Sequence, residues 1–67
     1  MKVYKVIFVK NVVSSIELLH RNIDMTGDYF YECVNERLIY AIVKASNEVE
    51  ARATGQQIIH EFLERNN

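Results

Sequence analysis

The chain has 67 residues, a formal net charge of −1 and one cysteine. Its length fits a single domain, and a domain of about 60 residues buries only about 60% of the surface that its unfolded chain exposes. The net charge gives no basic excess for a polyanion, and no apolar run approaches the roughly 20 residues that span a bilayer. Cys33 cannot form an internal disulfide, so we expect a cytoplasmic α+β domain, residues 1–67, that gains stability by association.

The N-terminal part begins with a segment from Lys2 to Val13 that is rich in Val, Ile, Phe and Tyr. These residue types favour strands, so the segment is the first predicted strand. Ser14 followed by Glu17 then fits a capping box, and apolar residues recur at helical spacing behind it, which predicts a short helix over residues 14–23. The stretch is also short and apolar enough to form a second strand, and that alternative stays open.

The middle of the chain predicts a loop over residues 24–28, where a glycine occurs, followed by a hairpin. The strands of the hairpin are Tyr29 to Val34 and Arg37 to Ala45, both rich in aromatic and β-branched residues. Only Asn35 and Glu36 separate them, and a two-residue connection is typical of an antiparallel hairpin.

The C-terminal segment predicts a helix that begins after Asn47, which forms a capping box with Glu50, and ends near Arg65. Gly55 lies inside this helix, where glycine costs about 1 kcal/mol relative to alanine, so we expect it to mark close approach to a strand. The predicted fold class is α+β, with the element order β-α-β-β-α. It comprises a three-stranded, largely antiparallel sheet with two helices on one face, a ferredoxin-like layout that lacks the last strand.

Alternation along the strands sorts the side chains onto two faces of this sheet. Regular pairing across the two-residue turn aligns Tyr31 with Tyr40 and Tyr29 with Ile42 on one face. The other face carries small residues such as Ala41, so we expect both helices to pack there.

This packing leaves an aromatic face of the predicted sheet without cover. Its residues are Tyr4, Val6, Phe8, Tyr29, Tyr31, Tyr40 and Ile42. Large exposed apolar patches usually mark interaction sites, and tyrosine is enriched in protein interfaces. We therefore expect a non-enzymatic interaction module that forms a homodimer, or docks a protein partner, through this face.

Residues Ile7 to Val12 resemble the first signature hexapeptide of the RNA-recognition motif family, and Tyr40 to Val43 match part of its second signature. That family stacks single-stranded bases on aromatic residues of an open sheet face, so the resemblance implies a stacking role for one aromatic residue of each signature. The nucleic-acid contacts expected from this alternative are Phe8, Tyr40, Lys10 and Lys44. The net negative charge disfavours it.

Candidate catalytic and metal-binding residues are few. His60 and Glu64 stand four residues apart on the predicted helix, a spacing that suits two metal ligands, but the sequence singles out no third. His20 and Cys33 would have to meet in space to act as base and nucleophile, and the apolar neighbours of Cys33 favour a buried thiol. We therefore expect no enzymatic activity, metal or cofactor, and the remaining alternative is a small ligand bound at the junction of a dimer.

Overall fold

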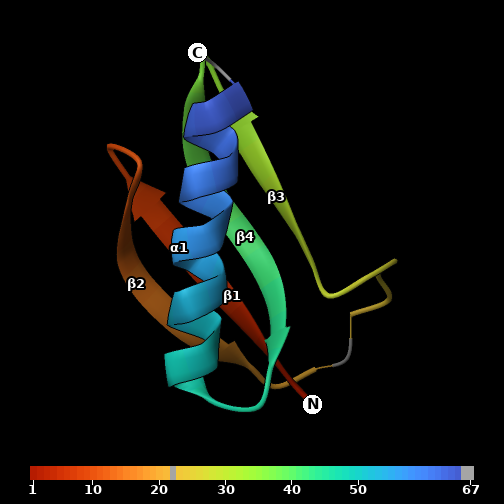
Figure 1. The fold of residues 1–67 in the computed structure, drawn as a ribbon. Helices are drawn as coiled ribbons and strands as arrows, with labels where there is room; N and C mark the ends of the chain where they lie inside the picture. Colours follow the sequence, from red (N-terminus) through yellow and green to blue (C-terminus); the bar gives the residue numbers. More distant parts are fainter. Residues whose placement is uncertain (22, 66–67) are drawn as a thin grey trace.

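The structure is a computed structural model that describes residues 1–21 and 23–65. Its five elements are β1 (Lys2–Val9), β2 (Val12–Leu19), β3 (Tyr29–Val34), β4 (Arg37–Ala45) and α1 (Glu48–Arg65). The strands form one sheet in the order β2-β1-β4-β3, and each neighbouring pair is antiparallel. Figure 1 shows α1 lying along one face of this sheet, so the domain has two layers.

The predicted fold class is wrong, because the segment after the first strand forms β2 and not a helix. The structure is a four-stranded antiparallel sheet with a single C-terminal helix. Lys10 and Asn11 have positive φ angles of 54° and 59°, which turn the chain back so that β2 pairs along β1. Twin positive φ angles suit the right-handed twist of a hairpin. Pairing with β1 satisfies the backbone groups of β2 and brings Val13 into the core, so the strand alternative prevails.

The second hairpin and the start of the helix are confirmed. β3 and β4 pair across Asn35 and Glu36, whose φ angles of 51° and 63° form the same kind of turn. The Asn47 side chain accepts a hydrogen bond from the Glu50 backbone N–H at 2.9 Å. The Glu50 carboxylate in turn accepts one from the backbone N–H of Ser46 at 3.2 Å, so the start of α1 is capped from both sides.

A bulge in β4 changes which side chains of the second hairpin share a face. Glu32 pairs with Tyr40, whereas Cys33 pairs with Leu38, so Ile39 is an extra residue in the ladder. An extra residue shifts the alternation on one side of the bulge relative to the other. As a result β3 is offset by one residue from the regular pairing, and its tyrosines no longer share a face with Tyr40.

A second bulge lies in β2, within the first hairpin. Ile7 pairs with Ser15 while Phe8 pairs with Val13, which leaves Ser14 as the extra residue. The bulge places Val13 on the same face as Phe8 and so extends the apolar surface under the helix. It also occurs in an edge strand, where bulges discourage pairing with another chain.

The core lies between α1 and the sheet face that carries Tyr4, Val6 and Phe8, which were expected to stay uncovered. Buried strand and helix residues pack there as one cluster of Tyr4, Val6, Phe8, Val13, Leu38, Ala41, Val43, Ala45, Ala51, Ile58 and Phe62. Tyr29 and Tyr31 pack against this cluster and are partly buried. The predicted face assignment is therefore wrong for the first strand and for β3, and right for Ala41, Val43 and Ala45 of β4.

Gly55 sets the distance between α1 and the sheet. A Cβ atom at this position would lie 3.2 Å from methyl groups of Val6 and Val13, closer than ordinary van der Waals contact. The expected close approach of the helix to the strands is thus confirmed. Ala51, one turn earlier, is fully buried on the same side of the helix.

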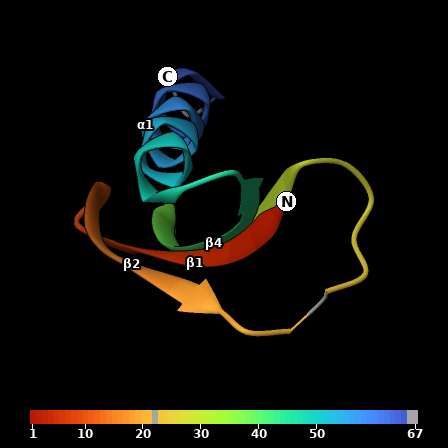
Figure 2. The same cartoon turned by 90° about the horizontal axis from the view of Figure 1, so that it is seen from below.

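The connection between β2 and β3 passes around the side of the sheet away from α1 (Figure 2). It joins the two edge strands, since β2 and β3 lie at opposite edges of the sheet. Within the described residues, no helix is both long and apolar enough to cross a membrane.

The Gly55 contact predicts a large cost for a larger side chain. Gly55→Val should lower the free energy of unfolding by about 2 kcal/mol, because added methyl groups overpack the space between α1 and the first hairpin. Chemical denaturation measures the loss. Ala53→Val, at an exposed position of the same helix, is the matched control and should cost only about 0.5 kcal/mol. Equal losses in the two variants would contradict the packing described.

Candidate interaction surface

The sheet face away from α1 is built from the alternate residues of all four strands. Register places them in rows across the sheet, with Ser15, Ile7, Tyr40 and Glu32 in one row and Glu17, Lys5, Ile42 and Phe30 in the next. Val9 pairs with Val12 at the hairpin end, and Leu19, Val3 and Lys44 form the row at the other end. The face thus mixes apolar residues with charged ones, which include Lys5 and Lys44 on the two central strands.

One half of this face is covered by the chain itself. Ile23, in the β2–β3 connection, lines one hollow with Tyr40 and Ile42 and another with Val3. Val3 and Ile42 are each only 6% exposed, although no helix lies over them. The connection therefore acts as a partial cover at the end of the sheet that carries the N-terminus.

The other half, near the two hairpin turns, has no such cover. Val9, Val12, Val34 and Ile39 are 54%, 59%, 58% and 43% exposed. Ile7 and Tyr40, which pair across β1 and β4, are partly buried beside them. We call this surface the hairpin-end patch, and it consists of Ile7, Val9, Val12, Val34, Ile39 and Tyr40.

Charged groups lie beside the hairpin-end patch, and one of them, Arg37, is the β4 partner of Val34. Glu32 stands across from Tyr40 on the edge strand β3. The Lys5 ammonium lies 5.3 Å from the centroid of the Tyr40 ring, within the range of a cation–π interaction. Lys5 faces Glu17 across the first hairpin. An apolar centre with a polar rim is the usual anatomy of a protein interface.

The structure separates the residues that were expected to form one open face. Tyr40 and Ile42 lie on the open face, Tyr40 at the hairpin-end patch and Ile42 beneath the connection. The other five expected interface residues, Tyr4, Val6, Phe8, Tyr29 and Tyr31, lie on the side of α1 and belong to or pack against the core. Val9, Val12, Val34 and Ile39 were missed. The sequence signal that could have indicated this surface was the pair of valines, Val9 and Val12, on either side of the Lys10–Asn11 turn.

The same arrangement separates the expected nucleic-acid contacts. Phe8 is 4% exposed beneath α1, whereas Tyr40 faces the opposite side of the sheet. Lys10 lies in the first turn and Lys44 near the other end of the sheet. Phe8 and Tyr40 therefore do not form a shared surface on which bases could stack.

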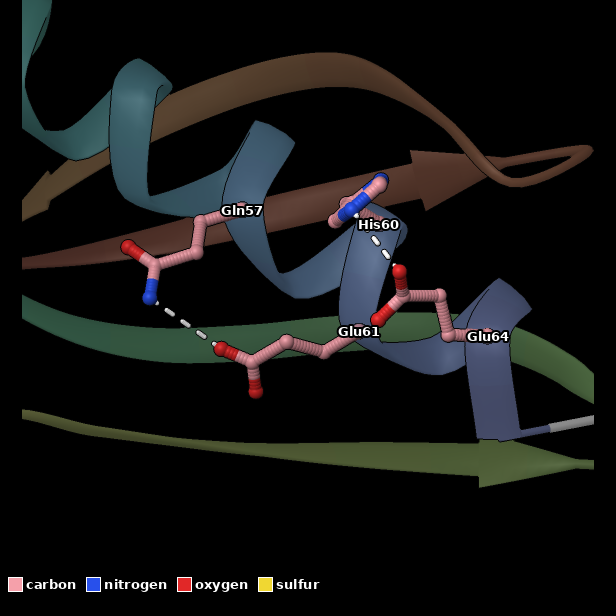
Figure 3. A network of polar contacts seen from close by, with 4 residues as sticks. All are labelled: Gln57, His60, Glu61 and Glu64. Carbon is pink, nitrogen blue, oxygen red and sulfur yellow. Dashed lines mark hydrogen bonds and ion pairs between the residues drawn. The ribbon is translucent and has the colours of Figure 1, made fainter.

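A polar cluster joins β3 to the last turns of α1. The Tyr29 hydroxyl donates to the two carboxylate oxygens of Glu61, at 2.8 and 3.1 Å. Gln57 Nε2 also donates to Glu61, at 3.1 Å (Figure 3), and the Arg65 guanidinium donates to the Tyr31 hydroxyl at 3.3 Å. Glu61 raises the pKa of Tyr29, because the neutral hydroxyl is the form that donates, and partial burial and the negative charge of Glu61 act in the same direction. The cluster fixes β3 against the helix.

The remaining candidate residues do not assemble into a site. His60 and Glu64 contact each other at 3.1 Å on the exposed side of α1 (Figure 3). No three His, Cys, Asp or Glu residues within 1–21 and 23–65 are grouped to hold a metal ion. Cys33 is exposed near the end of β3, not buried as expected, and His20 follows β2 at the opposite edge of the sheet.

Comparison with known proteins gives no relative. No protein-family model matches the chain, and no curated protein or solved structure is significantly similar to it. The function must therefore be argued from the molecule's own surfaces.

The Tyr29–Glu61 contact predicts a pH-dependent contribution to stability. Because the pKa of Tyr29 is raised above its ordinary value of 10.0, the stabilisation is present below pH 10 and is lost as the pH rises through the raised value. Tyr29→Phe should lower the free energy of unfolding by about 1 kcal/mol at neutral pH. The difference from the wild type should vanish at alkaline pH in denaturation curves.

Tyr4→Phe is the matched control, because the Tyr4 hydroxyl has no hydrogen bond to the described residues. It should change stability by less than about 0.5 kcal/mol. A Tyr29→Phe variant that matches this control at every pH would contradict the role assigned to the hydrogen bond.

Proposed function

We propose that the chain is a small, non-enzymatic interaction module that forms a homodimer through the hairpin-end patch. The observation that carries the proposal is the occurrence of four aliphatic side chains, each more than 40% exposed, at the uncovered end of the sheet. Exposed aliphatic residues that occur singly need no explanation, but several of them at one end of a sheet favour a surface that gains stability from burial.

The size of the sheet face supports a second copy as the occupant. The four strands are six to nine residues long, and at about 4.8 Å between strands and about 3.3 Å per residue they give a face of about 450 Å² in projection. The accessible area of the face is larger than this projected area, because side chains protrude from the sheet. A standard interface buries about 800 Å² on each partner, so the uncovered half of this face supports a smaller interface centred on the hairpin-end patch.

The interface of this dimer lies on the sheet face away from α1, whereas most of the aromatic residues first expected there lie under the helix. A two-fold axis would bring each hairpin-end patch against the same patch of the partner, with Glu32 and Lys5 at the rim. Such an arrangement also covers the apolar surface that one helix leaves exposed. Small domains frequently gain stability in this way, because their own cores are limited.

Lysine substitutions in the hairpin-end patch should separate the two copies. Val9→Lys and Ile39→Lys each place a charge in the apolar centre of the interface, and each should weaken association at least about tenfold. Sedimentation equilibrium should show the wild type at twice the 7.9 kDa mass of the chain, and the variants shifted toward the single-chain mass.

Val49→Lys is the matched control, since Val49 is 79% exposed on α1, away from the sheet face. It should leave the mass of the dimer unchanged, and circular dichroism should show that all three variants are folded. A wild type that stays monomeric at about 1 mM, or a control that dissociates as the patch variants do, would overturn the proposal.

A further inference from the structure

A hollow of about 430 Å³ lies beneath the β2–β3 connection, on the covered half of the sheet face. Its floor comes from β1, β2 and β4, and its outer wall includes Arg21 and Ile23. Small-molecule sites commonly have volumes of about 300–1,000 Å³ and combine apolar walls with a few polar groups. The hollow has both the size and the composition of such a site.

Three aliphatic residues give the hollow its apolar part. They are Leu19 of β2, Ile42 of β4 and Ile23 of the connection. Ile42 is almost fully buried, so this part of the floor belongs to the packed sheet. Ile23 also lines the neighbouring hollow beside Val3.

Two cations and one carboxylate line the same hollow. Lys5 and Arg21 are positive and Glu17 is negative, which leaves an excess of one positive charge. The Lys5 ammonium lies over the Tyr40 ring and forms no ion pair with Glu17 in the described part of the chain. Arg21 forms no hydrogen bond or ion pair with any residue of 1–21 or 23–65. Both cations therefore remain available to a bound anion.

We propose that this hollow binds a small organic carboxylate with an apolar body. The carboxylate would lie between Lys5 and Arg21, and the apolar body would pack on Leu19, Ile23 and Ile42. A guanidinium and an ammonium outnumber the Glu17 carboxylate in the lining of this hollow, and together with its aliphatic residues they favour an amphipathic anion over a neutral ligand or a bare inorganic anion. The site goes beyond the proposed dimer, which shares with it only Tyr40 of the hairpin-end patch and Lys5 at the rim of that patch.

Phenylbutyrate is a suitable probe, with phenylbutyramide as its neutral counterpart and acetate as an anion that lacks the apolar body. In NMR titrations of the whole chain, phenylbutyrate should shift the amide signals of Lys5, Leu19, Arg21 and Ile23. It should bind at least about tenfold more tightly than either phenylbutyramide or acetate, because only phenylbutyrate uses both parts of the site.

Two variants test the cations separately. Lys5→Met and Arg21→Gln should each weaken phenylbutyrate binding about tenfold and leave the affinity for phenylbutyramide unchanged. Lys10→Met is the matched control, because Lys10 lies in the first turn and does not line the hollow. Arg21 is exposed, so Arg21→Gln keeps the test valid if Lys5→Met fails to fold.

The proposal is overturned if phenylbutyrate produces no shifts at about 10 mM, if its shifts lie outside the hollow, or if phenylbutyramide binds equally well. The Val9→Lys variant distinguishes this test from that of the dimer. If that variant is monomeric and still binds phenylbutyrate, the hollow functions within one chain, as proposed. If it is monomeric and folded but loses binding, the site described within one chain is wrong.

Discussion

A single helix has to cover a sheet that is apolar on both faces, and the rest of the structure follows from that constraint. α1 approaches the first hairpin closely because Gly55 and Ala51 present almost no side chain to it. The helix covers one face of the sheet, so the large aromatic residues of β1 and β3 lie in the core or pack against it. The opposite face is left to the β2–β3 connection, which reaches only one end of it.

The two bulges decide which residues each face receives. Without the extra residue Ile39, regular pairing would turn Tyr29 and Tyr31 toward the same side as Tyr40. With it, both tyrosines pack on the side of α1, where Glu61 and Arg65 satisfy their hydroxyl groups. The polar ends of these side chains thus stay at the margin of the core while their rings contribute to it.

The parts of the fold that depend on local chemistry were predictable from the sequence. The turn at Asn35 and Glu36, the cap at Asn47 and the close approach at Gly55 each rest on a few neighbouring residues, and all are confirmed. The helix predicted over residues 14–23 was wrong, because Ser14 and Glu17 match the capping pattern but lie in a strand that pairs with β1. A bulge leaves no clear local signature, so the face of each tyrosine could not be derived from alternation alone.

The candidate surface was likewise predictable in part. An excess of apolar sheet surface was predictable from composition and length. Which face carries that excess depends on the side on which α1 packs and on the two bulges. The exposed aliphatic residues now define where association should occur. Mixing isotope-labelled and unlabelled chains and recording contacts between them by filtered NMR experiments tests this claim directly. The account predicts intermolecular contacts among the methyl groups of Ile7, Val9 and Ile39. Contacts confined to α1, or none at all, would contradict it.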